Sequence, residues 1–276
     1  MNEERMQRLL TLATSGFLIV FCLAPFVFMA VISLSGSPEF LSGQTAFNAT
    51  FGHYRAIITT PSLHFIDYLR NSLAVSAVSA AVSTLIAALA AYSLTRLELP
   101  GRVLILFLIL CVTMFPQISL IGFLFKLMTW LGWINTYGAL IFPYVAWVLP
   151  LSVWILVSYF AQLPRELDKA ALIDGCTRWQ ILRKVIAPVA LPGILSTALL
   201  SFIFAFNEFM FALLFTTDHR ARTVPVGIAL FQGLHGEIPW GNIMAASIVS
   251  IVPLLILAVA FQRHIIQGLT RGAVKG

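Results

Sequence analysis

Few residues in this chain have the types and the spacing that chemistry requires. The histidines and cysteines are scattered and match neither the spacing of a metal site nor that of a catalytic triad: His53, His64, His219, His235, His264, Cys22, Cys111 and Cys176. The sequence also contains no G-x-x-x-x-G-K-[ST] segment, whose backbone N–H groups would cradle nucleotide phosphates. We therefore predict that the chain has no catalytic residues, holds no metal or cofactor, and is not an enzyme.

The polar residues of most interest lie inside long apolar runs. Glu208 is the sole acid in any of these runs, and Asn207 precedes it. An ionisable residue surrounded by hydrocarbon is costly, so it is a candidate for function, while a hydrogen bond that ties two helices together is the alternative. Aromatic faces with a few polar groups bind small solutes, and the candidates to line a solute pathway are Gln117, Ser119, Tyr144, Trp147, Asn207 and Glu208.

The composition indicates that membrane helices position these residues. Hydrophobic residues make up 59% of the chain and charged residues 10%, whereas soluble domains carry about 25% charged residues. Six apolar runs reach the roughly 20 residues that cross a bilayer, and they are residues 9–34, 71–94, 103–125, 137–160, 191–215 and 243–261. Because hydrocarbon offers no hydrogen bonds to the backbone, we predict an all-α membrane protein with six transmembrane helices in one domain, residues 1–276.

Prolines interrupt several of the predicted spans, namely Pro25, Pro116, Pro150 and Pro253. Each proline removes a helix hydrogen bond, and a kink is the ordinary result in a membrane bundle. A full helix break that lines a pathway is the alternative. It is best supported at Pro116, because the polar residue Gln117 follows directly.

The distribution of Lys and Arg predicts the orientation of the chain. With the N-terminus inside, 12 of the 17 Lys and Arg residues lie in cytoplasmic segments and five lie outside. This bias follows the positive-inside rule and predicts that both termini are cytoplasmic. The net charge of +6 is then a topology signal rather than a sign of nucleic-acid binding. The first run is expected to be retained as an anchor, because it exceeds the roughly 7–15 apolar residues of a signal peptide.

The predicted cytoplasmic loop, residues 163–188, contains a helix with readable ends. Pro164 suits the first turn of a helix, and Glu166 and Asp168 lie where the helix dipole favours anions. Gly175 can adopt the left-handed conformation that ends a helix. The segment Thr177-Arg-Trp-Gln180 has the spacing of a capping box, so a second helix is expected to run from there to Pro188.

One face of the first loop helix carries Leu167, Ala170, Ala171 and Asp174 at helical spacing. Two alanines on one face permit close approach by another surface. The pattern therefore predicts either a docking face for another protein or an interfacial helix that lies on lipid headgroups.

Two predicted outside loops are longer than ordinary connectors. Residues 51–58 can form a short interfacial helix. The loop 216–242 carries several glycines and prolines, and it either reaches a partner at the outer face or packs over the bundle.

At the cytoplasmic loop the chain resembles the inner-membrane permeases of ABC importers, whose loop reads Glu-Ala-Ala, three residues, Gly, nine residues and Ile-x-Leu-Pro. At that spacing the chain has Lys169-Ala170-Ala171, then Gly175, then Val185-Ile186-Ala187-Pro188, and Asp174 and Trp179-Gln180 match the carbohydrate branch. The resemblance covers nearly the whole chain and is strongest to the maltose-permease G-type and trehalose-importer permease B-type subunits. It extends to Asn71-Ser72-Leu73, Thr113-Met-Phe-Pro-Gln-Ile-Ser119, Phe206-Asn207-Glu208-Phe209, Phe261-Gln-Arg and the tail 268–276.

The resemblance implies the type I importer permease fold in a bacterial or archaeal cytoplasmic (inner) membrane. It implies an ATPase dimer that binds ATP and Mg, a second and different permease, an extracytoplasmic sugar-binding protein and membrane lipid as partners, and no nucleic acid. The residues that it assigns to ATPase coupling are Glu166, Asp168, Lys169, Ala170, Ala171, Asp174 and Gly175, with Gly272 and Lys275 of the tail 263–276 as a second contact. Lys169 departs from the family glutamate, as Val185 and Ala187 depart from its Ile and Leu.

The cargo expected from the resemblance is a di- or oligosaccharide such as trehalose or maltose. A polyol or glycerol phosphate carried by the same kind of permease is the alternative. An ion-coupled secondary transporter is a rival of a different class, but it needs several ionisable groups within the spans and perhaps internal repeats. The single acid Glu208 and the lack of an evident repeat argue against it.

Overall fold

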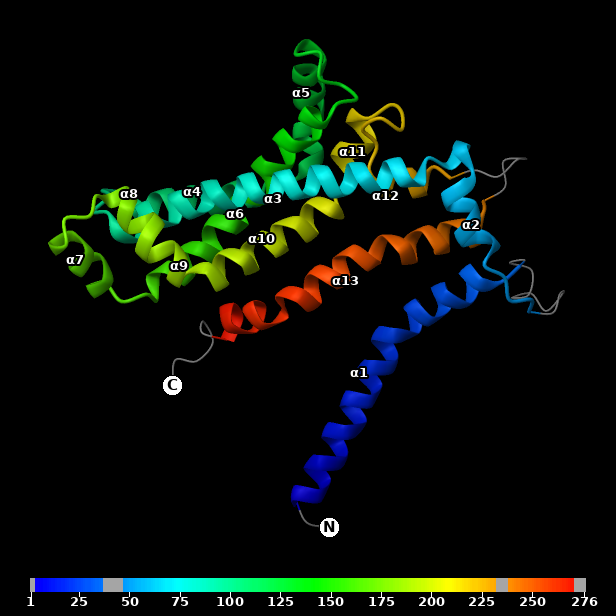
Figure 1. Cartoon of the computed structure of the whole chain (residues 1–276), viewed down its shortest axis with the longest axis horizontal. Helices are drawn as coiled ribbons and strands as arrows, with labels where there is room; N and C mark the ends of the chain where they lie inside the picture. The colour runs from blue at the N-terminus through cyan, green and yellow to red at the C-terminus, as the bar shows by residue number, and fades with distance from the viewer. Residues whose placement is uncertain (1–2, 37–46, 232–237, 271–276) are drawn as a thin grey trace. The chain divides into compact units, whose positions relative to one another are not determined.

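The structure is a computed structural model that describes residues 3–36, 47–231 and 238–270, with residues 3–5 and 263–270 described by their backbone alone. The elements are helices, and no strand occurs in these described ranges (Figure 1). They form two compact units, Met1–Ile66 with Ile228–Val252, and Asp67–Gly227 with Pro253–Gly276. Because the division passes through three continuous helices, the expected single domain stays a prediction.

The first unit contains α1 (Glu3–Leu34), α2 (Gly52–Thr59), the 3-10 turn η2 (Pro61–Leu63) and the start of α13 (Trp240–Thr270). His53 of α2 joins its parts, because Nε2 donates to the Ser35 carbonyl and Nδ1 contacts the Asn242 side-chain oxygen, both at 2.9 Å. Gly241 makes room for this imidazole, since a Cβ there would lie 2.3 Å from the ring. The short helix expected at residues 51–58 is therefore present as α2.

The second unit contains the remaining helices and most of the long apolar segments. In chain order they are α3 (Phe65–Arg96), α4 (Arg102–Thr113), α5 (Gln117–Trp130), α6 (Tyr137–Ala161), α7 (Glu166–Ile173), α8 (Arg178–Ile181), the π-helical turn η3 (Leu182–Ile186), α9 (Ala187–Val189), α10 (Leu191–Phe206), α11 (Met210–Phe215) and α12 (Val224–Ala229). The C-terminal half of α13 completes it.

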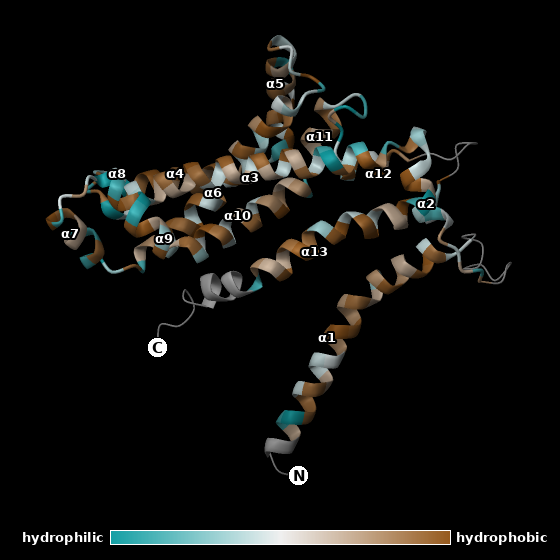
Figure 2. Ribbon diagram, viewed as in Figure 1, coloured by the Kyte–Doolittle hydropathy of each residue, from teal (hydrophilic) through white to brown (hydrophobic). Residues whose placement is uncertain are grey.

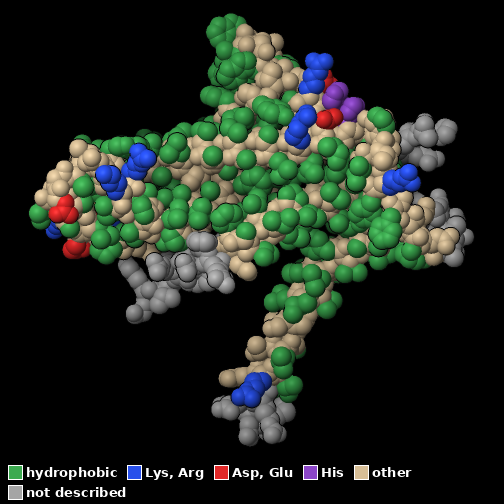
Figure 3. Space-filling model, in the orientation of Figure 1, with side chains coloured by type: hydrophobic (Ala, Val, Ile, Leu, Met, Phe, Trp, Pro, Cys, Tyr) green, Lys and Arg blue, Asp and Glu red, His purple; other side chains and the backbone are tan. Residues whose placement is uncertain are grey.

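Two larger apolar cores hold the second unit together, and a smaller one around Ala80 and Phe202 packs α10 against α3. The first joins α3, α6 and the loop helices around Ala91, Phe160 and Ile186, and the second joins α6 to α11 around Tyr144 and Phe215. Figure 2 shows hydrophobic residues along α3, α4, α6 and α10 and hydrophilic ones at α7 and α8. On the face drawn in Figure 3, the charged side chains of this unit gather over α7 and α8 and, at its other end, near α11 and α12. This separation suits helices whose middle lies in hydrocarbon.

The predicted spans correspond to four continuous helices and two bent pairs. α1, the segment Pro61–Arg96, α6 and α13 are each long and apolar enough to cross a membrane, and up to six spans result if each bent pair counts as one. The third predicted span bends by 88° between α4 and α5, which is the helix break considered at Pro116. The other bent pair, Arg178–Val189 with Leu191–Phe206, turns by 80° at the start of the fifth predicted span, and that span is interrupted again between α10 and α11. Pro25, Pro150 and Pro253 lie within continuous helices.

The contact between α6 and α10 depends on a glycine. A Cβ added to Gly193 of α10 would lie 2.6 Å from Cγ of Tyr159 in α6. The Cγ atom lies next to the backbone, so the ring cannot move aside by a simple rotation, and Tyr159 is itself buried. Gly193 therefore sets how closely these two helices approach.

We expect Gly193→Ala to destabilise the protein by about 1–3 kcal/mol, because the extra methyl group overfills a packed interface. The measurement is the thermal unfolding midpoint of the purified protein in detergent. Gly122→Ala in α5 is the matched control, because a Cβ there meets no atom within 4 Å. An equal fall of the midpoint in both variants would show that helix packing at Gly193 is not tight.

Candidate functional site

The loop between α6 and α10 has the helix ends that its sequence predicts. Gly175 has φ +78° and ends α7 in a Schellman motif, in which Cys176 N–H donates to the Ala171 carbonyl at 2.9 Å and Gly175 N–H to the Leu172 carbonyl at 3.1 Å. The capping box is present, with Gln180 N–H donating to Thr177 Oγ1 at 3.3 Å and Thr177 N–H to Gln180 Oε1 at 2.8 Å. Pro164 precedes the helix rather than lying in its first turn, because α7 begins at Glu166.

The loop helix turns two of its predicted coupling residues inward. Asp168 and Ala171 are buried, and Ala171 packs in the apolar core with Phe160 and Ile186. The other predicted coupling residues are exposed: Glu166, Lys169, Ala170, Asp174 and Gly175. Inward-facing residues cannot contact another protein directly, so Asp168 and Ala171 can act only by positioning α7. Of the face formed by Leu167, Ala170, Ala171 and Asp174, Ala171 is buried, and docking through the other residues stays a prediction.

Two hydrophobic residues complete the outer face of α7. Ile173 is 86% exposed and Leu172 is 41% exposed, although both belong to an ordered helix. Both side chains therefore present apolar surface away from the core of the second unit. The period of the helix could have identified Ile173, because it follows Glu166 and Ala170 at i+7 and i+3 on one face.

The predicted pathway residues at the break between α4 and α5 are accessible. Gln117 is the first residue of α5 and is half-buried, and Ser119 is exposed two residues later. The break itself keeps its backbone paired, since Met114 N–H donates to the Cys111 carbonyl and Phe115 N–H to the Val112 carbonyl, both at 3.2 Å.

The two aromatic candidates on α6 have different surroundings. Tyr144 is 1% exposed inside the second core, so it does not line an open surface. Trp147 contacts Phe211 edge-on, with ring centroids 6.5 Å apart. It also lines a cavity of ≈ 300 Å³ together with Trp154 and Thr113, at the end of α4. Trp147 is therefore the aromatic candidate that reaches open space.

Glu208 has a structural role in the described residues. Its carboxylate accepts hydrogen bonds from Phe211 N–H at 2.9 Å and Ala212 N–H at 3.2 Å. It thereby satisfies the backbone where α11 begins, after α10 has ended. The exposed Asn207 donates to the Ile203 carbonyl at 2.8 Å. The hydrogen-bonding alternative for Glu208 is present: its carboxylate accepts from the backbone that follows it, and it also interacts with the Tyr144 side chain of α6.

Asn71 joins three segments at the end of the second unit opposite α7. Its Nδ2 donates to the carbonyls of His219 and Arg222 at 2.9 Å each, and its Oδ1 accepts from the Tyr137 hydroxyl at 2.6 Å. The neighbouring Ser72 accepts from Val224 N–H at 2.8 Å. No local pattern predicts these contacts, because the partners lie 66 to 152 residues away in sequence.

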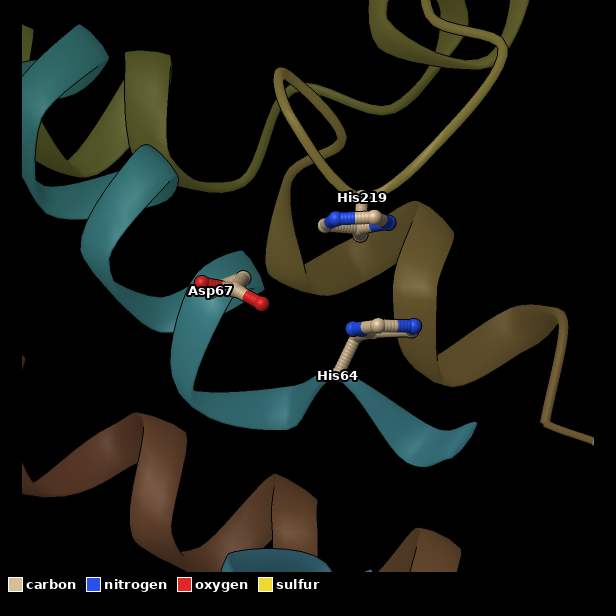
Figure 4. A group of neighbouring side chains, drawn as sticks. All are labelled: His64, Asp67 and His219. Carbon is tan, nitrogen blue, oxygen red and sulfur yellow. The ribbon is translucent and has the colours of Figure 1, made fainter. Parts of the chain in front are cut away.

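The same region brings two titratable side chains together. Figure 4 shows Asp67, in the first turn of α3, and His219, from the loop before α12, and their possible ligand atoms lie within 4.8 Å of each other. His64, also labelled there, precedes α3 with φ 46°. Asp67 also forms an ion pair with Arg70 at 3.3 Å. A carboxylate beside an imidazole serves hydrogen bonding as well as metal binding, so we assign no metal, and the absence of a metal site stays a prediction. The tail candidates Gly272 and Lys275 lie outside the described residues.

Comparisons with known proteins agree with the motif in the loop. A family model described as "Binding-protein-dependent transport system inner membrane component" matches residues 83–271. The chain is 54% identical, over 277 residues and 100% of both chains, to the trehalose/maltose transport system permease protein MalG of Thermococcus litoralis. It is 39% identical, over 258 residues and 93% of both chains, to the trehalose transport system permease protein SugB of Mycobacterium tuberculosis.

The fold is similar to that of a solved transporter. The match is to a chain of a bacterial ABC transporter involved in the import of the acidic polysaccharide alginate, with a TM-score of 0.80 and 18% identity. It covers 95% of this chain and 98% of that chain. The bent helices described above therefore belong to a known membrane-protein architecture.

We expect Asn71→Asp to destabilise the protein by several kcal/mol, because an anion would face two buried carbonyls that lose their donors. The measurement is the fall in thermal unfolding midpoint. Asn207→Asp is the matched control, because Asn207 is exposed and makes one local hydrogen bond. Equal losses in the two variants would contradict the role assigned to Asn71.

Proposed function

This chain belongs to the family of binding-protein-dependent transport system inner membrane components, and we propose that it passes a disaccharide of the trehalose or maltose type through the membrane. The family makes it a multi-pass permease of the inner membrane and part of an ABC importer, rather than an enzyme. The sugar cargo is supported by two relatives named for trehalose or for trehalose and maltose. A polyol or glycerol phosphate remains the alternative cargo.

The observation that carries the mechanism is the loop helix α7, which is fixed on one side and open on the other. Its inner face packs in the core through Ala171, and its outer face presents Glu166, Lys169, Ala170 and Ile173. We infer that this outer face docks on an ATPase in the cytoplasm. When two ATPases close on ATP, α7 moves as a rigid body, and α6 and α10 move with it between two arrangements of the bundle.

Three protein partners follow from this proposal. An ATPase dimer binds ATP and Mg, and this chain binds no cofactor of its own. A second, different permease forms the pathway together with this one, and a sugar-binding protein delivers the cargo from outside. Lys169 is exposed where the resembling loops carry glutamate, so an acidic group on the ATPase is the complementary contact.

Reconstitution of the whole transporter tests this function. Proteoliposomes that hold both permeases, the ATPases and the binding protein are expected to accumulate labelled trehalose or maltose when ATP is supplied. This chain alone, with or without an ion gradient, is expected to transport nothing, because its bundle movement depends on the ATPases. Uptake by the isolated chain would identify a carrier instead. Uptake of glycerol phosphate or a polyol in preference to both sugars would overturn the proposed cargo.

Gly175 tests the coupling role of the loop. We expect Gly175→Val to lower binding-protein-stimulated ATP hydrolysis and sugar uptake by about tenfold, because a β-branched residue at positive φ strains the turn by about 1–3 kcal/mol. A Cβ at this position meets no atom within 4 Å, so the strain arises in the backbone alone.

Gly175→Asn is the matched control for this variant, because asparagine tolerates the left-handed conformation far better than valine. It is expected to keep most of the transport activity. Normal coupled transport by the valine variant would end the argument for Gly175.

A further inference from the structure

A buried ion pair lies where the loop helix meets the rest of the second unit. Arg96 is the last residue of α3 and Asp168 lies in the first turn of α7. Their side chains are only 3% and 9% exposed, and Arg96 Nε lies 3.4 Å from Asp168 Oδ2. Charges withdrawn from water are costly unless they are paired. A buried charge pair therefore holds α7 against the end of α3.

The same guanidinium also binds the end of α6. Arg96 Nη2 donates to the carbonyls of Phe160 at 3.1 Å and Leu163 at 2.9 Å. These carbonyls belong to the last turn of α6 and to the segment after it, where helix carbonyls have few backbone partners and where the dipole favours a cation. The Phe160 carbonyl also accepts from Leu163 N–H at 3.2 Å. One side chain thus connects the ends of α3 and α6 to the beginning of α7.

This connection matters because the covalent link between α6 and α7 is short and irregular. Residues 162–165 separate the two helices and include Pro164. If the link bent freely, a force applied to α7 would be absorbed there. Leu163, in the middle of the link, is held from both sides, since its carbonyl accepts from Arg96 and its side chain packs in the first core.

Other polar groups approach the ion pair. The Tyr92 hydroxyl of α3 interacts electrostatically with Asp168, Arg178 and Arg96. Within the described residues, Arg96 Nε and both Asp168 carboxylate oxygens make no hydrogen bond, so the pair is held by charge rather than by a directional fork. The two attachments of Arg96 are therefore different in kind: hydrogen bonds to α6 and charge attraction to α7.

We propose that Arg96 is the positioning residue that makes α3, α6 and α7 move together, with Asp168 as its partner on the loop helix. The inference rests on the proposed docking of α7 on an ATPase and adds α3 to the helices that follow its displacement. Arg96 touches neither the ATPase nor the cargo in this scheme. It acts by preventing residues 162–165 from bending when α7 is displaced.

The two attachments can be separated by substitution. Asp168→Asn removes the charge attraction and leaves the hydrogen bonds to Phe160 and Leu163. Arg96→Lys keeps a cation near Asp168, but a single ammonium group cannot lie beside the carboxylate and donate to both carbonyls as the wider guanidinium does. The double variant Arg96→Gln with Asp168→Asn removes both charges at once.

The test uses the complete transporter in proteoliposomes and measures sugar molecules imported per ATP hydrolysed. Asp168→Asn and Arg96→Lys are expected to lower this ratio by about tenfold while ATP hydrolysis continues. The double variant is expected to lose no more than the worse of Arg96→Gln and Asp168→Asn alone, because the two residues act through one contact. Arg70→Gln is the matched control, because Arg70 forms an exposed ion pair with Asp67 and should leave the ratio unchanged.

A second readout separates this inference from the proposed function. With the three native cysteines replaced by serine, Ile173→Cys is expected to form a cross-link to the ATPase in the wild-type background and in the variants. If the cross-link is absent from the otherwise wild-type protein, the proposed docking fails. If the cross-link forms and the import ratio of both variants is normal, the docking stands and the role of Arg96 is wrong.

The test remains decisive if one of the variants fails to fold. Should Arg96→Lys fail to assemble, Asp168→Asn and the conservative Asp168→Glu carry the test, because both leave the carbonyl contacts of Arg96 in place. A normal ratio in Asp168→Asn overturns the inference. A lowered ratio that Asp168→Glu restores supports it, because a merely structural defect changes the amount of assembled transporter and leaves its ratio of sugar to ATP unchanged.

Discussion

Hydrocarbon supplies no hydrogen bonds, and the rest of the structure follows from how the chain satisfies its own polar groups. Where α4 ends, Met114 and Phe115 donate to carbonyls of the preceding turn. Where α10 ends, the carboxylate of Glu208 accepts from the first backbone N–H groups of α11. At these two interruptions, local hydrogen bonds therefore satisfy part of the backbone that a broken helix leaves unpaired.

The helix α3 shows how the second unit is held at both of its ends. Near the N-terminal end of α3, Asn71 donates to two carbonyls of the loop before α12. At the C-terminal end, Arg96 donates to two carbonyls at the end of α6. Between them α3 buries small side chains, both apolar ones such as Ala87 and Ala91 and hydroxyl-bearing ones such as Ser79 and Ser83. Directional polar contacts thus fix the register of the ends, while close packing holds the middle.

Patterns among residues close together in sequence were enough to predict the helices and several of their ends. The apolar runs predicted the membrane helices, and Gly175 and the Thr177–Gln180 pair predicted how α7 ends and α8 begins. The break at Pro116 was predicted only as an alternative to a kink, because a proline permits both, and the bend at Ala190 was not predicted. The local pattern also did not predict that Asp168 turns inward, because its partner Arg96 precedes it by 72 positions. Polar contacts between residues far apart in the chain cannot be seen in the periodicity of the sequence, yet they determine which face of α7 is exposed.

Arg96 also imposes an order on biogenesis. Its acceptors at Phe160 and Leu163 are 64 and 67 residues further along the chain. When α3 first enters the bilayer during synthesis, neither carbonyl exists, and the guanidinium has to remain among water and lipid phosphates at the membrane surface. Only after α6 has been inserted can this charge leave that surface and become enclosed by protein. Arg96 thus first anchors a newly made helix at the membrane surface and later joins α3 to α6 and α7 inside the folded subunit.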